Sequence, residues 1–142
     1  MLDELLEEVQ RNVRAALAED IGSGDATARL IPPKKTGTAI IRTRQKAILC
    51  GTGWAQACFR QVNQDCNMHW LAADGDEIEA GSILCRIQGP LRDLLTAERT
   101  AINFLQTLSA TSTRTRQYVD AIKGTPAQIY DTRKTLPGLR LA

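Results

Sequence analysis

A long apolar stripe follows Pro90 in this chain of 142 residues. Its apolar side chains recur at helical spacing, as Leu91, Leu94, Leu95, Ala101, Ile102, Leu105 and Leu108. Because proline suits the first turn of a helix, the pattern predicts a helix that begins near Pro90 and buries one face. A second, separate helix is predicted over residues 111–123, ending near Gly124.

Two more helices are predicted closer to the N-terminus. Residues 2–18 repeat apolar positions every three or four residues, which predicts an amphipathic helix that stops at the glycine-containing loop 19–25. The other helix is expected to begin after residues 51–53. The apolar positions of the first helix are Leu2, Leu5, Leu6, Val9, Val13 and Leu17.

The remaining patterned segments favour strands. Residues 36–50 are rich in Thr and Ile and are expected to form two strands that turn near residues 45–46. A further strand is expected over 66–72, and a tight β arrangement with turn glycines over 74–89. Residues 127–130 predict a short buried strand.

The charge of the chain is unevenly distributed. The net charge is +2, and residues 92–142 carry 8 Lys/Arg against 4 Asp/Glu. This excess suits a small anionic ligand, but it is too weak, with too few aromatic residues, to indicate nucleic-acid binding. No apolar run is long enough to predict a membrane span, and no signal peptide is recognised at the N-terminus, so we expect a cytoplasmic protein.

The cysteines do not form a metal-binding pattern. Cys50, Cys58, Cys66 and Cys85 include no C-x-x-C pair, and His69 is the one histidine. We therefore expect no metal ligands in this chain, and free cysteines that behave as small apolar residues in a reducing compartment.

A polar cluster over residues 131–135 is the strongest candidate for a site. It reads Asp-Thr-Arg-Lys-Thr and follows the predicted strand 127–130, the position at which α/β barrels place their active sites. Arg133 offers a planar fork for a carboxylate or phosphate, and Lys134 adds a mobile point charge. The alternative is a solvated loop held by an Asp131–Arg133 pair, and the residue pattern alone leaves both open.

Glu98 and Arg99 form a second candidate, within the predicted helix after Pro90. The helical spacing places Glu98 near the same stripe as Ile102, so the charged pair is expected close to the buried side. Arg99 is then either a partner in a surface salt bridge of little energetic weight or a rigidly held ligand-binding residue. Periodicity does not decide between them.

Two other interpretations of the sequence are weaker. The segment 74–89 resembles the β-hairpin of biotinyl and lipoyl carrier domains, but no lysine that could hold a prosthetic group lies between Lys46 and Lys123. Gly22-Ser23-Gly24 follows a helix instead of a strand, so it does not predict a dinucleotide-binding loop.

Two long motifs carry a resemblance to a known family. Residues 95–109, LTAERTAINFLQTLS, are followed about twenty residues later by residues 131–140, DTRKTLPGLR. Together they resemble the quinolinate phosphoribosyltransferase family, and the segments 19–25 and 75–81 match it in the same order. The resemblance covers nearly the whole chain.

The resemblance implies an α+β protein with two parts. Residues 1–110 would form an N-terminal α/β sandwich, an antiparallel sheet with helices. Residues 111–142 would lead into the start of a C-terminal α/β-barrel domain, most of which lies outside this chain. We therefore expect the chain to be a portion of a longer enzyme and to be inactive alone.

The resemblance also implies a reaction. Enzymes of this family transfer phosphoribosyl from phosphoribosyl pyrophosphate to quinolinate with decarboxylation, giving nicotinate mononucleotide, pyrophosphate and CO₂ in NAD biosynthesis. Mg²⁺ accompanies phosphoribosyl pyrophosphate, with its ligands expected outside this chain. The alternatives are a nicotinate-type or molybdenum-associated phosphoribosyltransferase paralogue, or a non-enzymatic β-rich binding module.

By match to the family motifs, Arg133 and Lys134 are expected to be catalytic and substrate-binding, and Thr132 to line the site. Arg99 would contact quinolinate across a homodimer interface and so complete the partner subunit's site. The chain departs from the family at Ala110, where glycine is common; alanine there costs stability only if its φ is positive.

Overall fold

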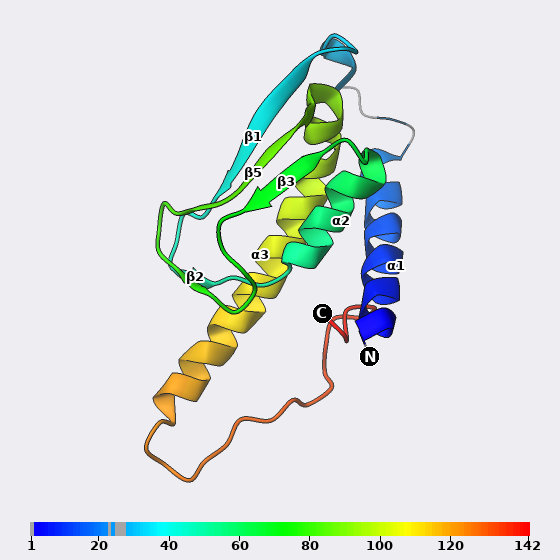
Figure 1. Ribbon diagram of the computed structural model, residues 1–142. Coiled ribbons are helices and arrows are strands. Elements are labelled where there is room, and N and C mark those ends of the chain that lie inside the picture. The colour runs from blue at the N-terminus through cyan, green and yellow to red at the C-terminus, as the bar shows by residue number, and fades with distance from the viewer. Residues whose placement is uncertain (1, 23, 25–27) are drawn as a thin grey trace.

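The structure is a computed structural model that describes residues 2–22, 24 and 28–142 (Figure 1). It is an α+β fold, as predicted, in which helices pack against antiparallel strands. The elements in chain order are α1 (Leu2–Ile21), the 3₁₀ turn η1 (Ala28–Leu30), β1 (Thr36–Arg42), β2 (Ala47–Ile48), α2 (Thr52–Val62), β3 (Asn67–Trp70), β4 (Glu77–Ile78), β5 (Ile83–Pro90) and α3 (Leu91–Ala121).

The main sheet has the strand order β1-β5-β3, with both pairs antiparallel. Side chains of β1 alternate between exposed and half-buried because one face of the sheet packs on the helices. In Figure 1, α3 runs behind this sheet and contacts β1 and β5, whereas α1 and α2 stand to the right of the sheet. A smaller sheet pairs β2 with β4 beside α3.

The core lies between the sheet and the three helices. Ile87, at the centre of β5, is fully buried and is paired with Ala39 on one side and Met68 on the other. The helices contribute the apolar faces that the periodicity predicts, including Val9, Val13, Leu17, Cys58, Leu94, Ala101, Leu105 and Leu108. Phe59, which was not predicted, joins this core.

Most of the predicted elements are confirmed, but their pairing differs from simple hairpins. The first helix extends to Ile21, three residues beyond the predicted end. The two strands within residues 36–50 do not pair with each other, because β1 joins β5 and β2 joins β4. In the predicted loop 19–25, Ser23 and Asp25 lie outside the described residues.

The prediction of two helices after Pro90 is wrong, because α3 continues without a break from Leu91 to Ala121. No glycine or proline interrupts this stretch. The hydroxyls of Thr111, Thr113 and Thr115 donate to the carbonyls four residues earlier, so these side chains are accommodated within the helix instead of ending it. Ala110 is helical, and the cost of a positive φ does not arise.

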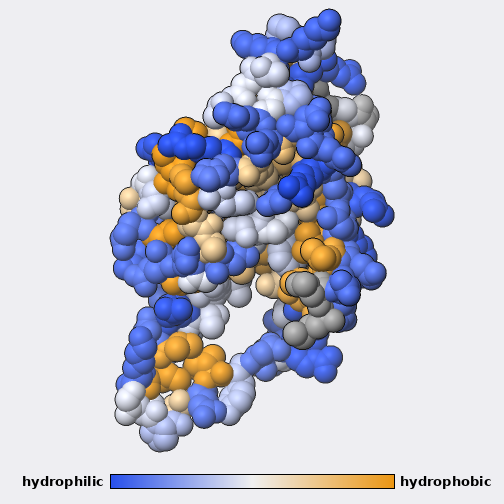
Figure 2. Space-filling model, viewed as in Figure 1, coloured by the Kyte–Doolittle hydropathy of each residue, from blue (hydrophilic) through white to orange (hydrophobic). Residues whose placement is uncertain are grey.

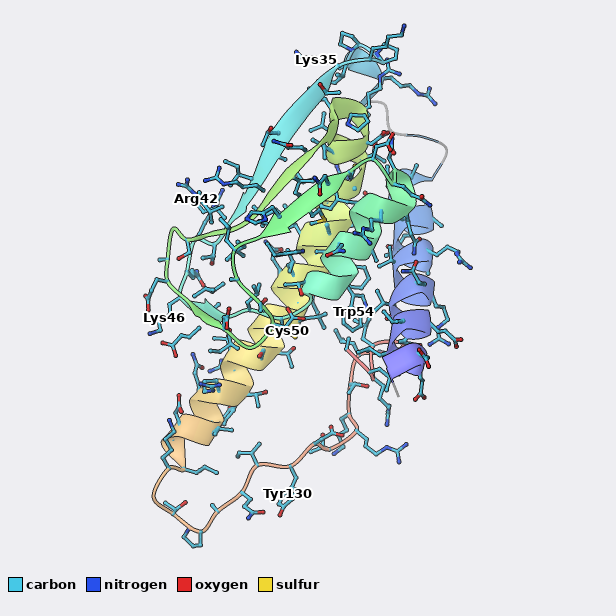
Figure 3. All side chains as sticks on the ribbon, viewed as in Figure 1. Lys35, Arg42, Lys46, Cys50, Trp54 and Tyr130 are labelled. Carbon is cyan, nitrogen blue, oxygen red and sulfur yellow. The ribbon has the colours of Figure 1, made fainter. Side chains whose placement is uncertain are left out.

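The prediction of a buried strand over 127–130 is also wrong. The segment is irregular, and Tyr130 is 75% exposed (Figure 3). A strand needs a neighbour for its backbone hydrogen bonds, and none of the described strands lies beside this segment. The described part of 111–142 therefore contains the last third of α3 and an irregular return segment, and no barrel strand. Within the described residues, no helix is long and apolar enough to cross a membrane.

Candidate functional site

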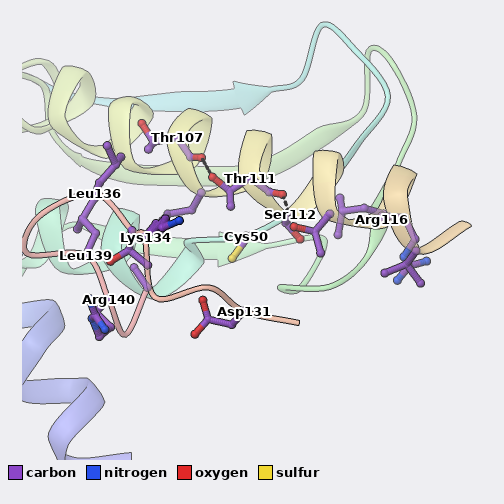
Figure 4. Close-up of a pocket in the computed structure, with 16 residues that line it drawn as sticks. Cys50, Thr107, Thr111, Ser112, Arg116, Asp131, Lys134, Leu136, Leu139 and Arg140 are labelled. Atoms are coloured by element: carbon purple, nitrogen blue, oxygen red, sulfur yellow. Dashed lines mark hydrogen bonds between the residues drawn. The ribbon is translucent and has the colours of Figure 1, made fainter. Parts of the chain in front are cut away.

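A groove of about 730 Å³ lies where the chain returns along α3 after the helix ends (Figure 4). One wall is α3, another is the segment at β2, and the third is the return segment 131–142. In the space-filling view an opening separates the projecting end of α3 from the returning chain (Figure 2). The residues that line the groove are Ile48, Cys50, Thr107, Leu108, Thr111, Ser112, Thr115, Arg116, Val119, Asp131, Lys134, Thr135, Leu136, Leu139, Arg140 and Ala142.

Threonines at four-residue spacing form the helical wall of the groove. Thr107, Thr111 and Thr115 share one face of α3, because residues i and i+4 lie one above the other. The Thr111 hydroxyl donates to the Thr107 carbonyl at 3.1 Å, and that of Thr115 to the Thr111 carbonyl at 2.9 Å. Each hydroxyl oxygen keeps lone pairs with which it can accept a hydrogen bond.

The β2 wall is held by side chains of α3. The Cys50 amide donates to the Ser109 hydroxyl oxygen at 3.0 Å, and this hydroxyl donates back to the Cys50 carbonyl at 3.1 Å. Burial, followed by the charge of Asp74, raises the pKa of the Cys50 thiol, which therefore stays protonated at neutral pH. Gly51 permits the close approach of this segment to α3, since it has a φ of 99° and a Cβ there would lie 2.9 Å from Leu108 Cδ1.

The return segment contains a backbone conformation that is unusual for a side-chain-bearing residue. Arg133 has a φ of 59°, in the left-handed region that costs about 1–3 kcal/mol for residues other than glycine. Asp131 Oδ1 accepts the Arg133 amide at 2.9 Å, and Arg140 Nη2 donates to the Arg133 carbonyl at 2.9 Å. Asp131 thus braces the Arg133 backbone through an Asx turn, and the predicted side-chain pair between them is absent from the described contacts.

The structure brings part of the predicted cluster into the groove. Lys134 lines it, whereas Thr132 and Arg133 are exposed and are not part of its lining. Arg116 and Arg140 line the groove with Lys134, and Asp131 is the one carboxylate in the lining. Three cations and several hydroxyls against one side-chain carboxylate make a site that favours a small anionic ligand.

Arg99 lies apart from this groove. It precedes Thr107 by eight residues, which corresponds to about 12 Å along the axis of α3. Both Glu98 and Arg99 are exposed, so the expectation that this pair sits near the buried side is wrong. The Arg99 side chain is 74% exposed and its Nη1 lies 3.0 Å from Asp20 Oδ1, at the end of α1.

Arg116, Arg140 and Asp20 were not predicted as site residues from the sequence. The four-residue spacing of the threonines was a signal for a polar helical face, and Arg116 directly follows that face. Asp20 also carried a signal, because a carboxylate in the last turn opposes the helix dipole. Arg140 is the last residue of the motif at residues 131–140, but its contact with Arg133 depends on how the segment turns.

The donor atoms of the groove do not fit a protein-held Mg²⁺ site. No group of three potential ligands among His, Cys, Asp and Glu is found within the described residues. In the groove lining, Asp131 is the one side-chain carboxylate, and it already accepts the Arg133 amide. Mg²⁺ prefers carboxylate and phosphate oxygens in octahedral geometry, which this set cannot supply.

Two family models match the sequence. Residues 25–109 match "Quinolinate phosphoribosyl transferase, N-terminal domain" and residues 111–142 match "Quinolinate phosphoribosyl transferase, C-terminal domain". The first match ends one residue before Ala110, and the second begins one residue after it, so the junction falls inside the continuous helix α3.

Curated relatives match over most of this chain but less than half of their own length. The probable nicotinate-nucleotide pyrophosphorylase [carboxylating] of Synechocystis is 37% identical over 125 residues, 88% of this chain and 42% of the relative. Quinolinate phosphoribosyltransferase [decarboxylating] 1 of Nicotiana glauca is 36% identical over 131 residues, 91% of this chain and 37% of the relative.

Solved structures give the same result. The nicotinate-nucleotide pyrophosphorylase of Francisella tularensis superimposes with a TM-score of 0.92 at 40% identity, covering 96% of this chain and 48% of that chain. The nicotinate-nucleotide pyrophosphorylase of Ehrlichia chaffeensis superimposes with a TM-score of 0.85 at 33% identity, covering 92% of this chain and 48% of that chain.

Proposed function

The chain belongs to the quinolinate phosphoribosyltransferase family, and from this premise we propose that it forms part of an enzyme that transfers phosphoribosyl to quinolinate. The proposed reaction joins quinolinate to phosphoribosyl pyrophosphate and releases CO₂ and pyrophosphate, giving nicotinate mononucleotide. The observation that carries the proposal is the cationic groove, whose lining includes Lys134 of the family motif together with Arg116 and Arg140.

The chemistry of the substrates agrees with these side chains. Quinolinate carries two adjacent carboxylates on a pyridine ring, so its site needs several cations in fixed positions. Lys134, in the groove, and Arg133, which precedes it outside the lining, would hold the carboxylates so that the ring nitrogen faces the anomeric carbon of the phosphoribosyl group. Arg116 and Arg140 would add positive charge from the groove lining. The same cations would stabilise negative charge as pyrophosphate leaves and as the carboxylate is lost. Thr132 would line this site.

Arg99 fits a role in the site of a second subunit. Its exposed guanidinium lies on the α1 side of α3, away from the groove that holds Lys134. An arginine so placed cannot line that groove in its own chain, but its exposure leaves it accessible to a partner. We therefore propose a homodimer in which Arg99 of one subunit contacts quinolinate bound at Lys134 of the other.

Mg²⁺ would enter this site together with phosphoribosyl pyrophosphate. Its role would be to neutralise charge on the pyrophosphate, and the groove cations of this chain would share that role. All four cysteines are free, which supports a reducing compartment such as the cytoplasm for the enzyme.

The experiment is a CO₂-release assay with quinolinate. It uses the chain continued to the length of its relatives, with the remaining part taken from the Francisella tularensis relative where necessary; we call this the extended protein. We expect CO₂ release that requires both phosphoribosyl pyrophosphate and Mg²⁺, and none from residues 1–142 alone. Consumption of nicotinate without CO₂ release would contradict the proposal and favour a nicotinate-type paralogue.

A further inference from the structure

The contact between Asp20 and Arg99 joins the last turn of α1 to α3. Arg99 Nη1 donates to Asp20 Oδ1 at 3.0 Å, across 79 residues of sequence. The Asp20 side chain is 24% exposed, whereas that of Arg99 is 74% exposed. The carboxylate is thus the less exposed member of the pair, and the guanidinium extends from it toward solvent.

Asp20 occupies a position that α1 alone would disfavour. The last turn of α1 contains no basic residue, and Glu19 adds a second carboxylate beside Asp20. The C-terminal end of a helix carries partial negative charge, so carboxylates there are unfavourable. Arg99 is the cation that contacts Asp20 among the described ion pairs, and it offsets this cost.

Stability alone does not account for the pair. Exposed salt bridges contribute little to stability, and a free arginine side chain has much rotamer entropy to lose. Little packing restrains the exposed Arg99 stem, so the bond to Asp20 has a larger effect on where the guanidinium points than on the folded state. The bond uses Nη1 and leaves the donors of Nη2 and Nε available to a ligand.

We infer that Asp20 is a positioning residue that holds the Arg99 guanidinium ready for the carboxylates of quinolinate bound in the partner subunit. This inference rests on the proposed function and adds to it a residue on another helix, which acts through Arg99 without touching substrate. Pre-ordering of Arg99 lowers the entropy that binding must otherwise remove, so the effect falls on quinolinate binding.

The first test measures the side-chain order of Arg99 in residues 1–142 by ¹⁵N relaxation of its Nε–Hε group. Asp20→Ala removes the acceptor, and it retains helix stability because alanine has the highest helix propensity and the unfavourable charge disappears. The control is Asp120→Asn, which breaks the exposed Asp120–Lys123 pair of 2.6 Å. We expect Asp20→Ala alone to lower the order of Arg99; unchanged order would overturn the inference.

The second test measures kinetics in the extended protein. For Asp20→Ala we expect kcat/KM for quinolinate to fall roughly tenfold, chiefly through KM, because a misplaced positioning group weakens the productive geometry. The KM for phosphoribosyl pyrophosphate should not change, and Asp20→Glu should restore part of the loss. A purely structural role predicts no such split between the substrates, and an unchanged quinolinate KM would refute the positioning role.

Subunit mixing separates this inference from the proposed function. Asp20→Ala mixed with Arg133→Ala should regain activity, whereas Asp20→Ala mixed with Arg99→Ala should not, because Asp20 and Arg99 act from the same subunit. If the wild-type extended protein releases no CO₂, the proposed function fails and the substrate role of Asp20 fails with it. Wild-type activity with unchanged Arg99 order would overturn the inference alone.

Discussion

The Thr113 hydroxyl oxygen lies 2.9 Å from the backbone nitrogen of Ile48, and the same hydroxyl donates to the Ser109 carbonyl at 2.6 Å. A side chain of α3 thus accepts the backbone hydrogen bond that a neighbouring strand would accept beside β2. Together with the hydrogen bonds between Ser109 and Cys50, the Thr113–Ile48 hydrogen bond anchors β2 to α3 and sets one wall of the groove.

Replacing Thr113 by valine should lower the free energy of unfolding by about 1–3 kcal/mol, because the buried Ile48 amide loses its acceptor while the side-chain shape is kept. Urea unfolding measures the change. Thr111→Val is the matched control, since its hydroxyl bonds only within the exposed side of the helix, and it should change stability by less than about 0.5 kcal/mol. Equal effects of the two variants would contradict the anchoring role.

Arg140→Ala should loosen the segment around Arg133, because it removes the donor to the Arg133 carbonyl. Loss of one hydrogen bond of about 1 kcal/mol raises the locally open population about fivefold. The rate of tryptic cleavage after Lys134 in residues 1–142 measures this opening. Arg114→Ala, which removes an exposed arginine bonded to Gln117, should leave that rate unchanged. A similar cleavage rate in both variants would argue against a role of Arg140 in holding the segment around Arg133.

Arg99→Ala and Arg133→Ala should each abolish turnover in the extended protein while leaving it folded. A random mixture of the two variants should recover about a quarter of wild-type activity, because half of the dimers are mixed and each has one intact site. CO₂ release after subunit exchange measures the recovery. Absence of recovery, with exchange demonstrated, would exclude a cross-subunit role for Arg99.

The buried thiols should make the protein less stable at alkaline pH. Burial raises the pKa of Cys58 to about 12 and that of Cys85 to about 11, from the ordinary value of 9.0. Below pH 9 both states are protonated and the contribution is fully present; above it only the unfolded thiols ionise, so stability is lost as pH rises toward the folded pKa.

The loss amounts to at most about 1.4 kcal/mol per pH unit for each thiol. Urea unfolding between pH 8 and pH 11 measures the slope. Cys58→Ala should make that slope shallower, even if alanine lowers the stability at every pH. A slope identical to that of the unmodified protein would mean that Cys58 does not contribute to the loss of stability at alkaline pH.

Ala110→Gly, which introduces the residue common in the family, should destabilise this chain by about 1 kcal/mol. Ala110 is exposed and lies in the interior of the continuous helix α3, where glycine has a larger conformational entropy to lose. Urea unfolding provides the comparison. Unchanged or higher stability would indicate that the helix is interrupted at this point in solution.

Several features of this protein were predictable from the sequence. The periodicities around Val13 and Leu105 identified the helices and their buried faces, because amphipathic spacing directly reflects which side is removed from water. Alternation located β1 and β5. The motifs at residues 95–109 and 131–140 indicated the family that the comparisons establish. The roles predicted for Thr132, Arg133, Lys134 and Arg99 remain predictions.

Only the tertiary structure decided which segments meet. Local patterns could not reveal that β1 pairs with β5, that α3 continues through its serine and threonine residues, or that residues 127–130 lack a strand partner. Nor could they reveal the contacts of Asp20 with Arg99 and of Arg140 with Arg133. Periodicity reports how each segment divides between water and core, whereas strand pairing and polar contacts depend on atoms that come together only when the separate segments pack.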